Sequence, residues 1–194
     1  MRKALDALGA FQKTVREGKQ IISSLLDCEK PVIAKLNGHA MGLGATIALF
    51  CDMIYAAENA KIGDPHIRVG LVAGDGGAVI WPQLIGYARA KEFLMTGNVL
   101  TATEAARIGL INHAIPAAEL DDCVREISDR LAAGPTKAIR WTKVSANIGL
   151  KHWRIRSWIP RCPTNGCRAC RTIIATPSTR SVRSARVYFP ARNE

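Results

Sequence analysis

Apolar side chains recur at helix and strand spacing over positions 1–151, and this pattern predicts alternating helices and strands. Short runs rich in β-branched residues predict buried strands at 31–36, 52–56 and 110–115. Apolar residues at near-helical spacing predict helices at 10–26, 45–50, 79–85 and 119–131. Trp81 and Trp141 lie within apolar helical patterns, so both are expected in the core. Strands that alternate with helices are typical of an α/β fold, which is the class that we predict.

Glycines and hydroxyl side chains mark where these elements begin and end. The loop 42–44 joins the first strand to the next helix, and a second glycine-rich loop covers 70–77. Thr101 and Glu104 have the spacing of a capping box, which predicts that a short helix begins there. Gly-Pro at 134–135 predicts the end of one helix and the start of another.

Composition divides the chain near residue 152. Residues 152–194 contain nine Arg, no Lys and no Leu, and they carry +8 of the net charge of +11. No helical or alternating period continues through this segment, so it offers no face for a core. We therefore predict one domain at 1–151, followed by an arginine-rich tail at 152–194 that lacks stable structure or is translated out of frame.

Composition also limits the protein's surroundings and partners. No apolar run reaches the ~18 residues of a membrane helix, and the N-terminus lacks a signal-peptide pattern, which predicts a cytoplasmic protein that binds no membrane. Most of the positive charge lies in the tail, so nucleic acid is not an expected partner of the domain. Three clustered cysteines, Cys162, Cys167 and Cys170, have part of an iron–sulfur spacing but no fourth downstream cysteine, so we predict no metal site.

The stretch 33–44, Ile-Ala-Lys-Leu-Asn-Gly-His-Ala-Met-Gly-Leu-Gly, resembles the signature of the crotonase (enoyl-CoA hydratase/isomerase) superfamily. Further matching segments follow in family order at 51–56, 62–65, 70–77, 94–97 and 105–111. The resemblance implies a crotonase-like ββα spiral core, incomplete here, and an acyl-CoA thioester as substrate. It also implies no metal or redox cofactor, a role in fatty acid metabolism, and a homo-oligomer, either a trimer or a dimer of trimers.

Enzymes of this superfamily stabilise an enolate formed from the thioester, which requires N–H donors aimed at the developing oxyanion. A glycine loop at a helix N-terminus presents such donors. By resemblance, Gly42, Leu43 and Gly44 form this oxyanion site, with the Leu43 amide as one donor. The alternative is that Gly42 and Gly44 only permit a tight strand-to-helix turn.

The acid/base residues depart from the family pattern. Hydratases of the superfamily use two glutamates, and ungapped alignment places Thr46 and His66 at those positions. Threonine cannot serve as a general base near neutral pH, whereas histidine can. Asp75 lies one position from the acidic residue of isomerase-type relatives. We therefore predict His66 and Asp75 as catalytic residues; a structural hydrogen bond for His66 and a turn role for Asp75 remain open, while Asp64 is expected in a turn and His39 beside the glycine loop.

Three functions follow from these features. The first is enoyl-CoA hydratase/isomerase chemistry on an acyl-CoA thioester, through an enolate stabilised by an oxyanion hole. The second is a catalytically impaired, truncated fragment that only binds CoA esters or assembles with other subunits, because the family's second oxyanion donor comes from a unit expected before residue 10. The third is nucleic-acid binding through the arginine-rich tail, which steep salt dependence would reveal.

Overall fold

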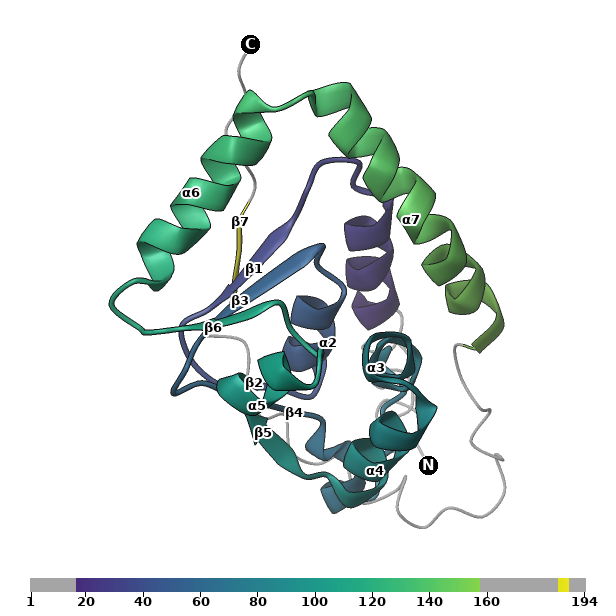
Figure 1. Ribbon diagram of the computed structural model, residues 1–194. Helices are drawn as coiled ribbons and strands as arrows, with labels where there is room; N and C mark the ends of the chain where they lie inside the picture. Colours follow the sequence, from purple (N-terminus) through teal and green to yellow (C-terminus); the bar gives the residue numbers. More distant parts are fainter. Residues whose placement is uncertain (1–16, 158–184, 189–194) are drawn as a thin grey trace, which may run out of the picture.

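The computed structural model describes residues 17–157 and 185–188, and it forms two small sheets surrounded by helices (Figure 1). The larger sheet has the order β6-β3-β1-β7, from strands His113–Ile115, Met53–Ala57, Ile33–Leu36 and Ala185–Tyr188. The smaller sheet has the order β2-β4-β5, from strands Ala40–Met41, Lys61–Gly63 and Val99–Thr101. Residues 17–27 are helical, and the other helices are α2 Leu43–Leu49, η1 Pro65–Val69, α3 Gly77–Ile85, α4 Tyr87–Thr96, α5 Ala102–Arg107, α6 Leu120–Ala133 and α7 Thr136–Ser157. The predicted α/β class is confirmed.

Strand β1 is buried on both faces because a different layer of helices covers each one. On one face, Val32, Ala34 and Leu36 belong to the larger core cluster, which also includes residues of α2 and α3. On the other face, Ile33 packs in a smaller cluster with residues of α6, such as Val124. This arrangement explains why apolar residues occupy consecutive positions at 32–34 and again at 36, without alternating with exposed polar residues. Lys35 is also buried, and it pairs with Asp121 of α6.

The parallel pairing of β1 with β3 positions the glycine loop. β1 lies in register with β3 from Ile33 opposite Met53 to Leu36 opposite Ala56, and β3 pairs in parallel with β6. Two parallel strands must be joined by a crossover, which the chain makes through β2 and α2. The loop 42–44 therefore directly follows β2, which pairs with β4 in the smaller sheet.

A buried ion pair attaches α7 to the start of β3. The Lys143 Nζ lies 2.7 Å from Asp52 Oδ2 and donates a hydrogen bond of 2.8 Å to the carbonyl oxygen of Lys30. Asp52 Oδ2 also accepts a 2.7 Å hydrogen bond from the Val32 amide. Every charged group in this small network therefore has a partner. Beside it, burial raises the pKa of the Cys51 thiol to about 12.

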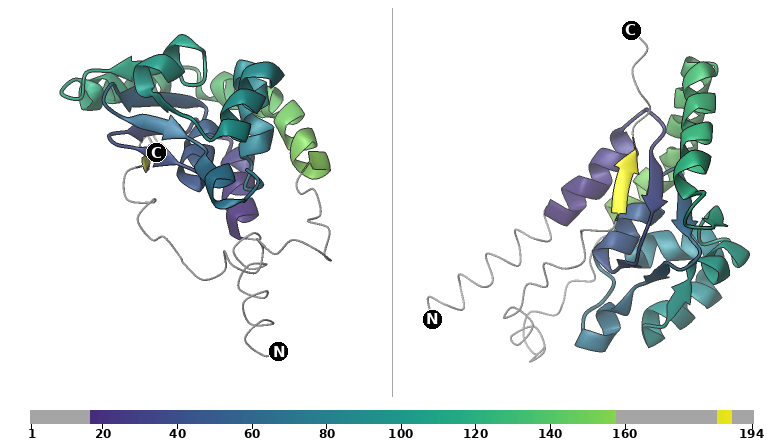
Figure 2. Two further views of the ribbon diagram at one scale, coloured as in Figure 1. Left: turned by 90° about the horizontal axis from the view of Figure 1, so that it is seen from below. Right: turned by 90° about the vertical axis from the view of Figure 1, so that its left-hand side faces the viewer.

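Two features of α7 and the tail differ from the simplest expectation. Trp81 is buried as predicted, but the prediction for Trp141 is wrong, because its side chain is 69% exposed on α7. Helix α7 also continues past the predicted boundary at 151. Strand β7, drawn in yellow beside β1 in Figure 2, belongs to the segment 152–194 and pairs antiparallel with β1. The clustered cysteines and most of the tail lie outside the described residues.

Among residues 17–157 and 185–188, no helix has both the length and the apolar character needed to span a membrane.

Candidate active site

Gly42 turns the chain from β2 into α2 with a backbone conformation that favours glycine, φ +54° and ψ −123°. Its amide donates a 3.0 Å hydrogen bond to the Gly63 carbonyl, which fixes the loop against β4. The helix begins at Leu43, so the first-turn amides, including those of Leu43 and Gly44, have no acceptor within the helix. These N–H groups are the donors that an anionic oxygen would use.

The imidazole of His66 lies directly against Gly42. A β-carbon built on Gly42 would be 3.1 Å from His66 Cε1 and 3.4 Å from Nε2. Glycine is therefore required here both for its positive φ and for the space that the ring occupies. The ring is next to the residue that immediately precedes the Leu43 amide.

Asp64 holds the other side of the ring. Asp64 directly follows β4 and is the N-cap of η1; its Oδ1 contacts His66 Nδ1 and accepts a 3.3 Å hydrogen bond from the His66 amide. Pro65 occupies the first position of η1, a place that suits its fixed φ and missing N–H. Asp64 and His66 thus hold each other in place through two contacts, one to the ring and one to the backbone.

Asp75 lies on the Nε2 side of His66 and contacts α2. Its Oδ1 accepts 3.2 Å hydrogen bonds from Thr46 Oγ1 and from the Gly77 amide, and its Oδ2 lies 3.8 Å from His66 Nε2. Thr46 is fully buried and cannot itself act as a base, but it orients a carboxylate that can. The loop before α3 therefore brings an acid next to the helix position where the hydratase glutamate was sought.

Two glycines allow this close approach of loop and helix. A β-carbon on Gly76, which has φ +123°, would lie 3.0 Å from both Phe50 Cε2 and Thr46 Cγ2. A β-carbon on Gly77 would collide with Asp64 Oδ2. Gly77 thus leaves the space that Asp64 Oδ2 occupies, and its amide donates a hydrogen bond to Asp75.

The ionisable groups of this cluster shift one another's pKa values. The hydrogen bond with Asp64 raises the pKa of His66, while burial acts in the opposite direction and the nearby Asp75 carboxylate adds to the rise. Burial raises the pKa of Asp75, and the positive charge of His66 partly offsets this rise. Within the described part of the chain, Asp64 Oδ2 and Asp75 Oδ2 are buried without a hydrogen-bond partner. Perturbed groups with unsatisfied buried oxygens are typical of functional sites.

Asp64, His66 and Asp75 each offer one atom of a kind that can bind metal, and these atoms lie within 4.8 Å of one another. However, His66 Nδ1 is already engaged by Asp64, and Thr46 and Gly77 both contact Asp75 Oδ1. The three side chains thus form an internally paired acid–base cluster, which suits proton transfer.

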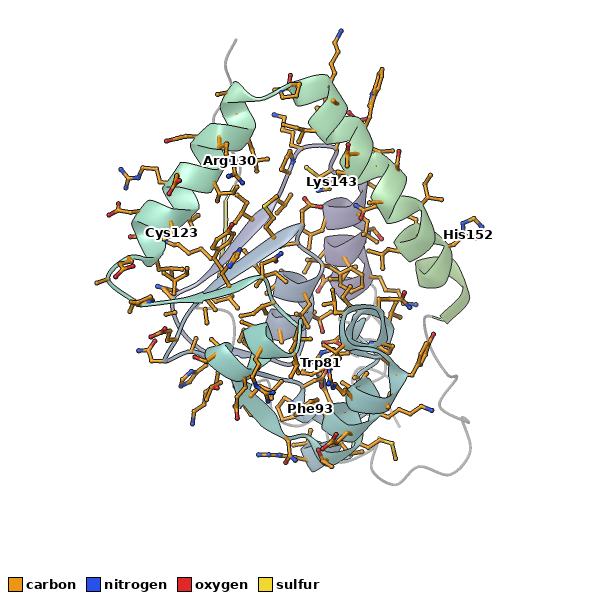
Figure 3. All side chains as sticks on the ribbon, in the orientation of Figure 1. Trp81, Phe93, Cys123, Arg130, Lys143 and His152 are labelled. Atoms are coloured by element: carbon orange, nitrogen blue, oxygen red, sulfur yellow. The ribbon has the colours of Figure 1, made fainter. Side chains whose placement is uncertain are left out.

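A separate hollow of about 290 Å³ lies between α6 and the edge of the larger sheet. Cys123 and Arg130 line it from α6 (Figure 3), and the tilted ring pair of Tyr55 and His113, with centroids 4.9 Å apart, lines it from the strands. It includes none of the residues of the acid–base cluster.

The structure brings the predicted site residues together. Gly42, Leu43 and Gly44 form the start of α2, and His66 and Asp75 face each other beside it; their catalytic roles stay predictions. Asp64 was expected only in a turn, and its contact with His66 was missed although the spacing of two residues was visible. His39 is near the loop as expected, with its Nδ1 accepting a 3.1 Å hydrogen bond from the Lys61 amide.

Comparison with known proteins gives consistent matches. Residues 4–157 match the family model described as enoyl-CoA hydratase/isomerase. A crotonyl-CoA hydratase of Syntrophomonas wolfei is 40% identical over 134 residues, which are 69% of this chain and 52% of the relative. The chain spans about half the length of the curated relatives it matches.

Solved structures agree with the sequence matches. An enoyl-CoA hydratase from Bacillus anthracis superposes with a TM-score of 0.71 at 31% identity, covering 76% of this chain and 58% of that one. An enoyl-CoA hydratase/isomerase from Mycobacterium paratuberculosis superposes with a TM-score of 0.68 at 40% identity over the same shares.

Proposed function

This chain belongs to the enoyl-CoA hydratase/isomerase family, and on that premise we propose that it acts on an acyl-CoA thioester through an enolate. In this proposal the Leu43 amide stabilises the oxyanion, and His66 and Asp75 transfer protons. No metal or redox cofactor takes part. The observation that carries the proposal is the contact of the His66 ring with Gly42, because it places an acid/base group beside the oxyanion donor.

The proposed chemistry begins when the thioester oxygen accepts a hydrogen bond from the Leu43 amide. In a β,γ-unsaturated thioester, whose α-carbon is sp³, His66 Nε2 takes a proton from the α-carbon, and the C–H electron pair forms a double bond between the α-carbon and the carbonyl carbon. The carbonyl π pair moves onto oxygen, where the helix N-terminus stabilises the charge. The imidazolium that results lies next to the Asp75 carboxylate.

Return of the proton decides the outcome. If the acyl chain carries a β,γ double bond, delivery of the proton to the γ-carbon shifts that bond to the α,β position. If water adds to the β-carbon of an α,β-unsaturated thioester, the base takes a proton from the water and the α-carbon of the enolate receives one. In both cases a group that can hold or release a proton near neutral pH is required, which the His66–Asp75 pair supplies.

Exposed apolar side chains beside this pair support an acyl substrate. Ile67 and Val69 on η1 and Val72 in the following loop are 44%, 57% and 61% exposed. They lie between His66 and Asp75 along the chain, so the segment that joins the two proposed proton-transfer residues carries apolar side chains exposed to solvent. Apolar surface of this kind favours a ligand with a hydrocarbon chain.

The experiment incubates the folded protein in D₂O with crotonyl-CoA, to follow hydration, and with its β,γ-unsaturated isomer 3-butenoyl-CoA, to follow deuterium incorporation into the acyl chain. Hydration of crotonyl-CoA reports addition of water, and deuterium at the sp³ α-carbon of 3-butenoyl-CoA reports enolate formation even without net turnover. His66→Ala and Asp75→Asn should each lower these rates by about 10²- to 10⁴-fold. His152→Gln, a change of an exposed histidine on α7, serves as the matched control and should leave the rates unchanged.

Two results would contradict the proposal. Rates that stay the same in both variants would remove His66 and Asp75 as proton-transfer groups. Binding of the CoA ester by folded protein with neither hydration nor deuterium uptake would instead favour the impaired fragment that only binds CoA esters.

The proposal includes self-association into a trimer or a dimer of trimers. Trp141, Val144 and Ile148 recur at spacings of three and four along α7, and each is at least 36% exposed, so α7 presents an apolar face. Light scattering after gel filtration measures the mass directly. A monomer at all concentrations would remove this part of the proposal without affecting the chemistry.

A further inference from the structure

We propose that Asp64 is a positioning residue that keeps the proton of neutral His66 on Nδ1 and thereby reserves Nε2 for proton transfer. The consequence for turnover rests on the proposed function. The protonation pattern itself can be measured without any substrate, so failure of one does not imply failure of the other.

The geometry assigns the two ring nitrogens different tasks. Nδ1 contacts Asp64 Oδ1, whereas Nε2 faces Gly42 and lies 3.8 Å from Asp75 Oδ2. A carboxylate only accepts hydrogen bonds, so the Asp64 contact requires a proton on Nδ1. Neutral His66 then carries its lone pair on Nε2, the nitrogen that lies toward Gly42 and Asp75.

Asp64 is buried far more deeply than a capping residue requires. It is only 2% exposed, and its Oδ2 has no hydrogen-bond partner in the described ranges. A buried carboxylate is costly unless a positive or strongly donating partner compensates it. His66 is the ionisable side chain in contact with it, so the cost of burying Asp64 is offset by polarising the imidazole.

The surroundings of His66 determine which charges can act on it. Asp64 comes from its own segment, and Asp75 comes from the loop before α3. Helix α2 contributes Gly42 and its first-turn amides, with no charged side chain. Arg68, the next charged residue on η1, extends toward Gly97 at the end of α4. Two carboxylates therefore dominate, one at each ring nitrogen.

A histidine held between two aspartates can gain and lose a proton at Nε2 while Nδ1 stays protonated. Protonation of Nε2 creates an imidazolium that Asp64 stabilises from one side and Asp75 from the other. Loss of that proton returns the ring to the Nδ1–H form, because Asp64 still holds Nδ1. Asp64 thus makes the ring return to the same tautomer after each transfer, without touching the reacting atoms.

The direct test is long-range ¹H–¹⁵N NMR of the protein without substrate, with the His66 signals assigned by their loss in His66→Ala. Above its titration, wild-type His66 should be protonated on Nδ1 and not on Nε2. Asp64→Asn keeps an oxygen that can cap η1 but removes the charge, so the pKa of His66 should fall. The control Glu58→Gln removes a charge from the exposed turn after β3 and should leave that pKa unchanged.

The proposal is overturned if neutral wild-type His66 is protonated on Nε2, or if the pKa of His66 is equal in Asp64→Asn and wild type. If Asp64→Asn fails to fold, the wild-type tautomer alone decides the question.

A second readout separates positioning from simple structural support. In wild type with measurable turnover, the acidic limb of the pH–rate profile follows deprotonation of His66. Asp64→Asn should move this limb to lower pH and lower kcat by on the order of 10²-fold, with KM little changed. A limb that does not move would show that Asp64 acts only as a helix cap and would overturn the assignment.

Discussion

Two largely buried clusters of charge in this protein differ in how completely their polar atoms are hydrogen-bonded. In the first, Lys143 of α7 pairs with Asp52, and the Lys30 carbonyl and the Val32 amide complete the hydrogen bonds of both charged groups. In the second, Asp64 and Asp75 flank one imidazole, and each carboxylate keeps a buried oxygen without a partner among the described residues. The charged groups of the first cluster all have partners, whereas two carboxylate oxygens of the second have no hydrogen-bond partner in the described part of the chain.

Hydrogen-bond satisfaction separates charged groups that support the fold from charged groups that are available for chemistry. A satisfied pair has no capacity left for a ligand, and it fixes the position of a helix. A cluster with unpaired buried oxygens lowers the stability of the fold, but it keeps acceptor oxygens and a titratable imidazole that can interact with a substrate. Burial alone would not distinguish the two, since Lys143 and Asp64 are both buried.

The largest stability effect is expected in the satisfied cluster. Lys143→Met keeps an apolar stem of similar length but leaves the Asp52 charge without its cation. Removing one member of a buried ion pair costs about 3 kcal/mol, so the free energy of unfolding should fall by roughly that amount. Urea denaturation measures the change. The proton-transfer rate per folded molecule should stay the same. A loss of that rate would contradict the view that the Lys143–Asp52 pair supports only the fold.

A somewhat smaller loss of stability is expected at Gly77. This glycine leaves space for Asp64 Oδ2, and its amide donates a hydrogen bond to Asp75. Gly77→Ala places a methyl group against Asp64 Oδ2 and within 3.1 Å of the Ala73 β-carbon. Overpacking of this kind costs about 1–3 kcal/mol. Thermal unfolding should detect the loss, and deuterium exchange into the acyl substrate should fall with it. Ala78→Gly, at an exposed position on the same helix, is the control for local backbone effects.

Asp75→Asn should raise the stability of the fold at neutral pH, whereas Lys143→Met should lower it. Burial raises the pKa of Asp75, so folding favours the protonated carboxyl. The stability that protonated Asp75 contributes is present below the ordinary pKa of the unfolded state, and it is lost as pH rises through the higher pKa of the folded state. Asparagine resembles the protonated form. The variant should therefore have a higher Tm than wild type at neutral pH and a smaller difference at acidic pH. An equal or lower Tm at neutral pH would contradict the view that this charge costs stability.

The smallest effect is expected for an exposed ion pair on the same helix as Lys143. Arg140 pairs with Glu29, and both side chains are about half exposed. Solvent screening limits such pairs, so Arg140→Ala should change the free energy of unfolding by less than about 0.5 kcal/mol. A change as large as that of Lys143→Met would mean that docking of α7, and not burial of charge, sets the size of both effects.

The sequence predicted the longer elements because their hydrophobic periods are clear. The helix at 119–131 appears as α6, and the capping box of Thr101 and Glu104 forms as predicted at the start of α5. Strands β2, β4 and β5 have only two or three residues, too few to show an alternating period. Helix α4 was missed because Ala90 is its only buried residue, so it has little apolar stripe.

The site was predictable in its residue types and not in its contacts. The glycine loop, His66 and Asp75 were found from their resemblance to family motifs. Asp75 is nine positions from His66, and only the path of η1 and the following loop brings Nε2 and Oδ2 to 3.8 Å. Trp141 shows the converse error, because an apolar residue in a helical pattern is buried only if another element covers it.

The parallel pairing of β1 with β3 has a consequence for the order of folding. Ile33 and Met53 become neighbours across a short stretch of chain, whereas Tyr55 must find His113 across a much longer one. The entropy of closing a loop rises with its length, so β1, α2 and β3 can associate before β6 joins them. The turn that presents the Leu43 amide would then be formed early, and the groups that move protons would be added to it as the later loops close.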